Sequence, residues 1–97
     1  MNKQVVLTKL TGCIEEIRQR FSVRGLSIFG SIARDESADD SDVDVLVVFD
    51  RKGSFDLFMD LKFYLEELLG TKVDLVTDNA LRPQVRQAIE QELIHVA

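Results

Sequence analysis

Two aspartates separated by one residue, Asp42 and Asp44, stand at the start of the most apolar stretch of the sequence. In a β-strand, side chains two positions apart point to the same face, so these carboxylates would lie side by side. Like charges this close raise the pKa of one group unless a cation intervenes. Hard oxygen ligands in this arrangement suit Mg²⁺ or Mn²⁺. An isolated Asp-x-Asp is more often a pair of solvated loop carboxylates, so the motif needs support from elsewhere in the chain.

A third aspartate, Asp74, lies inside an apolar segment, Val-Asp-Leu-Val at residues 73–76. A carboxylate there must face solvent, be paired or bind a metal ion. If its strand lies beside the strand that follows Asp42, Asp74 can join Asp42 and Asp44. Three such carboxylates could hold two cations about 3.5–4 Å apart, which supports in-line displacement at phosphorus.

A Gly-Ser pair, Gly30 and Ser31, follows the apolar residues 26–29. Glycine lets the backbone approach a ligand closely, and the neighbouring amides and the serine hydroxyl can donate to phosphate oxygens. By itself the pair is weak support, because Gly-Ser at a strand end usually forms only a turn.

The elements that must position these residues follow from hydrophobic periodicity and from glycine, serine and proline signals. The predicted elements are, in chain order, a helix over residues 4–20, a strand over 26–29, a helical turn and loop over 31–41, a strand over 43–49, a turn over 51–54, a helix that Ser54 caps and that ends at Gly70, a strand over 73–76, a helix with Pro83 in its first turn, and an extended tail over 93–97.

The order of these elements predicts an α+β (mixed α/β) fold, with a small mixed sheet and helices packed on it. The connection between the first two strands is too short for a regular crossover helix, so we expect them to be antiparallel. In the last helix, Val85, Ala88 and Ile89 are predicted to face inward.

Length and composition limit the classes of protein that the chain can represent. Its 97 residues fit one compact domain, residues 1–97, and its formal net charge of −5 disfavours sequence-independent binding to nucleic acid. Cys13 is the only cysteine, which excludes an internal disulfide and a cysteine-based zinc site. The absence of a long apolar run excludes a membrane span and a signal peptide, so we expect a cytoplasmic protein. So small a domain is compatible with a homo- or hetero-oligomer.

The motifs resemble those of the nucleotidyltransferase superfamily that includes DNA polymerase β. Residues 30–34 read Gly-Ser-Ile-Ala-Arg and residues 41–45 read Ser-Asp-Val-Asp-Val, and residues 32–41 supply the ten positions that the superfamily places between Gly-Ser and Asp-x-Asp. Ala33-Arg34 and Ser41 resemble more narrowly the minimal nucleotidyltransferases (MNT), small prokaryotic antitoxins commonly paired with a HEPN-domain toxin. The resemblance covers nearly the whole chain.

The resemblance implies a role for each matching residue. Asp42, Asp44 and Asp74 would be the catalytic residues and the ligands of two Mg²⁺ ions, with Mn²⁺ as an alternative, and Asp74 would also help to activate the acceptor hydroxyl. Gly30 and Ser31 would hold the β- and γ-phosphates of ATP.

Two further nucleotide-binding residues are implied, Arg34 and Ser41, although Arg34 could equally be a surface ion-pair residue. The chain departs from the group at Asp35, where glycine is common. The extra negative charge would weaken ATP binding unless the side chain points away.

Two functions follow from the resemblance. In the first, the protein transfers AMP from ATP to a hydroxyl of a partner protein, a tyrosine of a HEPN-type toxin. In the second, it is a non-catalytic antitoxin that neutralises its toxin by binding. The intact set of aspartates favours the enzyme, because burying acidic groups without a function carries a cost.

Other reaction classes fit less well. An EF-hand counted from Asp40 needs glycine at its sixth position and glutamate at its twelfth, where Val45 and Arg51 stand. No Walker A or Gly-x-Gly-x-x-Gly pattern occurs. His95, the only histidine, lies near the end of the chain and is expected at the surface or in an interface.

Overall fold

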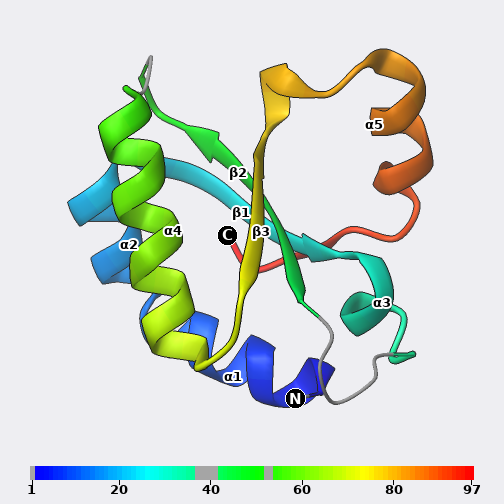
Figure 1. Ribbon diagram of the computed structural model, residues 1–97, viewed down its shortest axis with the longest axis horizontal. Helices are drawn as coiled ribbons and strands as arrows, with labels where there is room; N and C mark the ends of the chain where they lie inside the picture. Colours follow the sequence, from blue (N-terminus) through cyan, green and yellow to red (C-terminus); the bar gives the residue numbers. More distant parts are fainter. Residues whose placement is uncertain (1, 37–41, 52–53) are drawn as a thin grey trace.

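The structure, a computed structural model, describes residues 2–36, 42–51 and 54–97 (Figure 1). The predicted Ser41, residues 37–41 of the predicted helical turn and loop over 31–41, and residues 52–53 of the turn over 51–54 lie outside these residues. The elements are α1 (Lys3–Gly12), α2 (Ile14–Phe21), β1 (Val23–Phe29), α3 (Gly30–Ala33), β2 (Val43–Phe49), α4 (Phe55–Leu69), β3 (Val73–Thr77), the 3-10 helix η1 (Asp78–Ala80), α5 (Pro83–Glu90) and β4 (Ile94–His95).

The four strands form one mixed sheet in the order β3-β2-β1-β4. β1 and β2 are antiparallel, which confirms the prediction from their short connection. β2 and β3 are parallel, with α4 between them in the chain, and β4 pairs antiparallel with the other edge of β1. The predicted α+β class is therefore correct.

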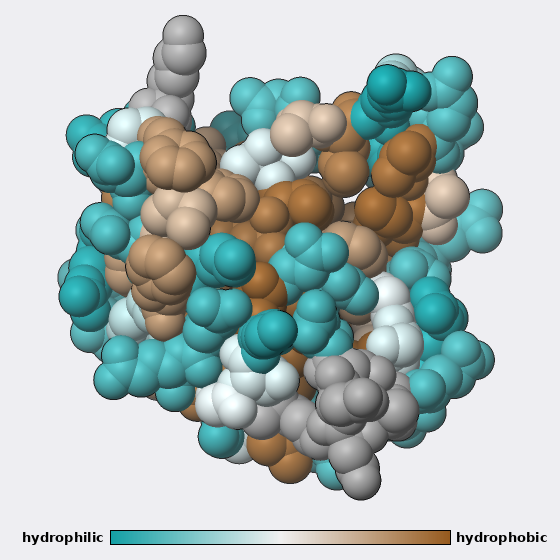
Figure 2. All heavy atoms as spheres, viewed as in Figure 1, coloured by the Kyte–Doolittle hydropathy of each residue, from teal (hydrophilic) through white to brown (hydrophobic). Residues whose placement is uncertain are grey.

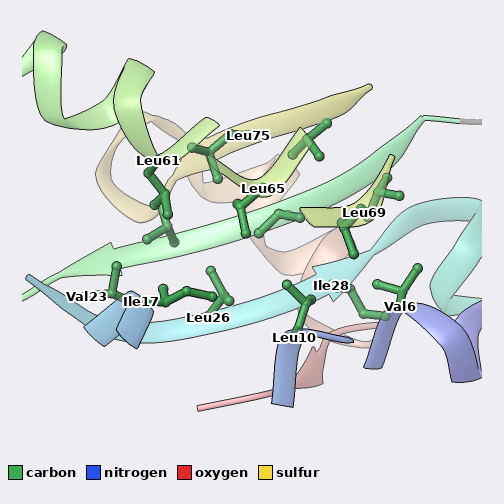
Figure 3. Packing of buried hydrophobic residues seen from close by; sticks show 14 of the residues in the cluster. Val6, Leu10, Ile17, Val23, Leu26, Ile28, Leu61, Leu65, Leu69 and Leu75 are labelled. Carbon is green, nitrogen blue, oxygen red and sulfur yellow. The ribbon is translucent and has the colours of Figure 1, made fainter. Parts of the chain in front are cut away.

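One face of the sheet carries the hydrophobic core. Val45 and Val47 of β2 and Leu26 and Ile28 of β1 are buried there, because alternate residues of a strand point to the same side. Figure 3 shows leucines of α4 and apolar side chains of α1 and α2 packed with them. The intervening residues, such as Leu46, face the opposite side of the sheet.

The predicted single helix over residues 4–20 is wrong, because the structure divides it into α1 and α2 at Cys13. Gly12 precedes the break and has the lowest helix propensity after proline, so the helix is easily interrupted there. Cys13 has φ −116° and ψ 9°, outside the helical region, and its side chain packs half-buried against the core. The change of direction lets apolar residues of both helices reach the same core.

Helix α4 begins and ends as the sequence predicts. The Ser54 hydroxyl accepts a hydrogen bond from the Leu57 amide at 3.1 Å, which satisfies one free donor of the first turn. Gly70 ends the helix with φ 71°, a left-handed conformation that glycine adopts without strain. α4 thus connects the parallel strands β2 and β3 in the chain and covers the core face of the sheet.

The inward orientation predicted for Val85 and Ala88 is wrong. Val85 is 44% exposed, Ala88 is also exposed, and only Ile89 is half-buried. Pro83 does occupy the first turn of α5. Figure 1 shows α5 standing apart from α1, α2 and α4, and no residue of α5 belongs to the hydrophobic core or packs against it.

The chain after α5 returns to the sheet. The predicted extended tail forms β4, and the Val96 amide donates to the Leu26 carbonyl at 2.8 Å. An ion pair between Arg86 and Asp78 connects α5 to η1. No helix in the described part of the chain is long and apolar enough to span a membrane.

Candidate active site

The parallel pairing of β2 and β3 brings two of the predicted site residues together. Asp44 of β2 is the register partner of Asp74 of β3. Asp44 is half-buried, whereas Asp74 and Asp42, which immediately precedes β2, are exposed. Because Asp44 alternates with the buried Val43 and Val45, its side chain lies on the face of the sheet opposite the core.

The electrostatics of the site centre on Asp44. Burial raises the pKa of the Asp44 carboxyl, and the negative charges of Asp74 and then Asp42 raise it further, together with a hydrogen bond to Asp74. Arg34 acts in the opposite direction. A cation bound beside these carboxylates would relieve their repulsion, so the donor set fits a hard divalent metal ion.

The carboxylates do not form a closed cage in this conformation. Among the residues that the structure describes, no three acidic, histidine or cysteine side chains are close enough to hold a metal ion together. Asp42, Asp44 and Asp74 are therefore neighbours that interact electrostatically, with Asp44 in the central position.

Gly30 forms the wall of the site next to Asp44. Its φ of 77° lies in the left-handed region. The preceding residue, Phe29, is the last residue of β1 and pairs with Asp44 of β2. A Cβ atom on Gly30 would overlap Asp44 Oδ2 and lie 3.0 Å from Asp44 Cγ. Only glycine permits both this backbone conformation and this contact.

The predicted phosphate-binding residues lie on the short segment after β1. Ser31 is half-buried in α3, and Arg34, directly after α3, is exposed. Figure 1 shows α3 beside the start of β2, and the charge of Arg34 acts on Asp44. Ser41 lies outside the described residues.

A carboxylate that the sequence did not indicate completes this region. Glu92, between α5 and β4, accepts a hydrogen bond from the Gly30 amide at 3.1 Å (Oε1) and pairs with Arg34 Nη1 at 2.9 Å (Oε2). Arg34 Nε also donates to Glu36 at 3.1 Å. The ion-pair alternative for Arg34 is thus present in this conformation, in contact with the predicted site. No local pattern around Glu92 predicts a contact that spans 62 residues of sequence.

Asp35 has φ 62°, a conformation favoured by glycine and tolerated by aspartate. This explains why glycine suits the position, and the Asp35 side chain is exposed.

His95 is also exposed, as expected, and its Nδ1 lies 2.8 Å from the hydroxyl of the buried Ser27. This contact ties β4 to β1.

Comparisons with known proteins agree with the fold. A model of the nucleotidyltransferase domain family matches residues 10–96. The chain is 42% identical over 87 residues to protein adenylyltransferase MntA of Thermococcus cleftensis, a match covering 90% of this chain and 88% of that relative.

The structure is similar to a solved structure described as a minimal nucleotidyltransferase, with a TM-score of 0.82, 33% identity and coverage of 97% of this chain and 95% of that chain. It is also similar to a chain in the structure of a tri-AMPylated Shewanella oneidensis HEPN toxin in complex with an MNT antitoxin, with a TM-score of 0.68 and 16% identity over 98% of this chain and 71% of that chain. At this identity the second likeness shows the fold alone. From its fold, its motifs and its similarity to these proteins, the chain belongs to the nucleotidyltransferase domain family, within the minimal nucleotidyltransferases.

Proposed function

We propose that this protein transfers AMP from ATP to a hydroxyl group of a partner protein, and that the partner is a HEPN-type toxin which the transfer silences. In this proposal residues 1–97 act as a single minimal nucleotidyltransferase domain. The observation that carries it is the register of Asp44 with Asp74, beside a glycine turn in contact with Asp44. The similarity to protein adenylyltransferase MntA supports the choice of AMP and of a protein acceptor.

The three aspartates have distinct positions in the proposed reaction. Asp42 and Asp44 would hold Mg²⁺ and the nucleotide, and Asp74 would complete the metal site from β3. The donor chemistry and the raised pKa of Asp44 support this assignment. Two bound Mg²⁺ ions would neutralise charge on the triphosphate and on the oxygens that enter and leave the α-phosphorus.

At the α-phosphorus the transfer forms one bond and breaks one, and a proton leaves the acceptor hydroxyl. The acceptor oxygen bonds to the α-phosphorus of ATP, and the bond from that phosphorus to the bridging oxygen of the β-phosphate breaks, which releases pyrophosphate. The Asp74 carboxylate accepts the proton of the acceptor hydroxyl. The Gly30 amide, the Ser31 hydroxyl and the Arg34 guanidinium hold the leaving phosphates, since all three are hydrogen-bond donors.

A second candidate function is neutralisation of the toxin by contact alone. Exposed apolar side chains on α4 favour a protein partner, because Phe55 is 75% exposed and Phe63 is 56% exposed. Figure 2 shows apolar side chains gathered along the outer side of α4. Such a surface fits both functions, whereas the carboxylates at the site favour transfer.

The proposal is tested by intact-mass spectrometry of the partner toxin after incubation with this protein, ATP and Mg²⁺. We expect the toxin to gain the mass of one or more AMP units. Asp42→Asn should abolish the gain, because it removes a charged ligand of the metal site. Asp50→Asn is the matched control, since it makes the same change of charge just beyond the other end of β2.

An unmodified toxin in a stable complex with this protein would overturn the proposal in favour of the contact antitoxin. Equal modification by the wild type and by Asp42→Asn would leave transfer intact but refute the metal-site assignment.

A further inference from the structure

The phosphate-binding donors of the proposed site already have an anionic partner within the chain. One oxygen of Glu92 accepts from the Gly30 amide at 3.1 Å, and the other is 2.9 Å from Arg34 Nη1. A carboxylate that bridges a backbone amide and a guanidinium makes the contacts that a phosphate group would make. Figure 1 shows the segment after α5 running back past the end of β1, and Glu92 lies in this segment.

Glu92 and a nucleotide phosphate cannot bind the Gly30 amide and Arg34 at the same time. The Gly30 amide has one hydrogen and serves one strong acceptor at a time. A triphosphate at the same place would also meet the negative charge of Glu92, in a site that already contains Asp42, Asp44 and Asp74. Bound phosphate and the observed position of Glu92 are therefore incompatible.

We propose that Glu92 is an internal competitor of the nucleotide, which occupies the donors of Gly30 and Arg34 until the phosphates of ATP displace it. The inference rests on the proposed function, because it takes these donors to be the triphosphate site. It adds a residue that lowers nucleotide affinity and thereby sets the ATP concentration at which the site fills.

The backbone around Glu92 allows this exchange without unfolding the tail. Two residues later β4 is paired with β1, and the Val96 amide donates to the Leu26 carbonyl at 2.8 Å, so the main chain stays fixed on the sheet. The Glu92 side chain is 26% exposed and therefore has a path to solvent. Rotation about its own bonds is enough to release the Gly30 amide.

Arg34 is not left without an anion when Glu92 leaves. Its Nε is hydrogen-bonded to Glu36 at 3.1 Å, while Nη1 faces Glu92. A phosphate can take over Nη1 while Glu36 continues to hold Nε, because the guanidinium offers several donors in fixed directions. Competition is therefore confined to the Gly30 amide and one edge of Arg34.

The test is the affinity of a non-hydrolysable ATP analogue with Mg²⁺, measured by isothermal titration calorimetry on the isolated protein. Glu92→Gln removes the charge with little change of shape, and Glu92→Ala removes the acceptor. We expect the dissociation constant to fall about three- to tenfold in Glu92→Gln, and at least as far in Glu92→Ala, since a partly exposed charged pair is lost from the competing state.

Glu90→Gln is the matched control, because it makes the same change of net charge at an exposed position on α5. We expect its dissociation constant to stay within about twofold of the wild type, because screening weakens the effect of exposed charges. A similar gain in Glu90→Gln would assign the effect to net charge and overturn the inference. Circular dichroism identifies any variant that does not fold. If one of the two Glu92 variants is unfolded, the dissociation constant of the other one tests the inference.

Unchanged or weaker binding in the folded Glu92 variants would overturn the inference, and weaker binding would make Glu92 a positioning residue for Arg34. Binding that tightens as expected without AMP transfer to the toxin would support the competitor while refuting the proposed reaction. No binding of the analogue to any variant would overturn both.

Discussion

Gly30 and Asp44 are the residue pair on which the geometry of the site depends. The left-handed φ of 77° at Gly30 turns the chain at the end of β1, and the missing Cβ leaves room for the Asp44 carboxylate. The Gly30 amide donates to Glu92, on the side where we propose that phosphate binds. A side chain at position 30 would therefore affect both the backbone conformation and the position of a proposed metal ligand.

We predict that Gly30→Ala lowers AMP transfer by about 100-fold, because a catalytic group displaced by about 1 Å costs this much. Gly70→Ala is the matched control: its φ is 71°, but no atom lies within 4 Å of the added Cβ. Both variants should lose about 1 kcal/mol or more of unfolding free energy from backbone strain. Transfer rates and urea denaturation separate the two effects, and equal transfer by both variants would contradict the role of the contact.

At the scale of elements, the segment after β1 connects the glycine turn to β2 and has a strained end. Asp35 closes α3 with φ 62°, its amide donating to the Ile32 carbonyl at 3.0 Å. Aspartate tolerates this conformation better than most residues, but glycine adopts it without a Cβ penalty. Because the Asp35 side chain is exposed, replacing it removes few contacts.

We predict that Asp35→Gly raises the unfolding free energy by about 0.5–1 kcal/mol, through relief of the left-handed conformation. Asp35→Ala removes the same charge but keeps a Cβ, so it should not stabilise the protein. Urea denaturation of both variants measures the difference. A gain in Asp35→Ala as large as in Asp35→Gly would show that charge, rather than backbone conformation, limits stability here.

The elements themselves were largely predictable from the sequence. An apolar run rich in β-branched residues predicted β2 with its observed bounds, and Ser54 and Gly70 predicted the ends of α4, because these signals act within a few residues. The prediction for α5 failed where packing decides the outcome. The exposure of Val85 depends on whether a core lies beneath α5, which periodicity alone does not show. The break at Cys13 follows a local signal, the low helix propensity of Gly12, which the apolar periodicity outweighed in the prediction.

At the scale of the whole molecule, the carboxylates of the site add to a net charge of −5. The pKa of Asp44 is raised from its ordinary value of 3.8, chiefly by burial and by Asp74 and Asp42. Because the pKa of Asp44 is higher in the folded than in the unfolded state, protonated Asp44 contributes fully to stability at a pH below its unfolded pKa. This contribution to the free energy of unfolding is lost as the pH rises through the folded pKa. Without metal, the ionised site therefore opposes folding at neutral pH.

We predict that in the presence of a chelator Asp44→Asn is more stable than the wild type at about pH 7, and that the difference shrinks as the pH falls through the raised pKa of Asp44 toward its ordinary value of 3.8. Mg²⁺ should raise the melting temperature of the wild type at neutral pH, because binding to the folded state stabilises it. Thermal unfolding with chelator and with Mg²⁺ measures both effects. An equal response to Mg²⁺ in wild type and Asp44→Asn would contradict the assignment of Asp44 as a metal ligand.

The sequence by itself determined which chemistry this protein carries. The spacing of Gly30-Ser31 from Asp42 and Asp44, and the isolated Asp74 in an apolar strand, are properties of short segments. They could be interpreted without a fold, because side chains two apart on a strand share a face wherever that strand lies.

Only the tertiary structure decided which of these groups meet. The register of β2 with β3 places Asp74 opposite Asp44, and the pairing of β4 with β1 holds Glu92 near Gly30 and Arg34 across 62 residues of sequence. Such contacts depend on the order and register of strands in the sheet, and no local pattern specifies these. For the same reason, the competing carboxylate became visible only in the folded chain.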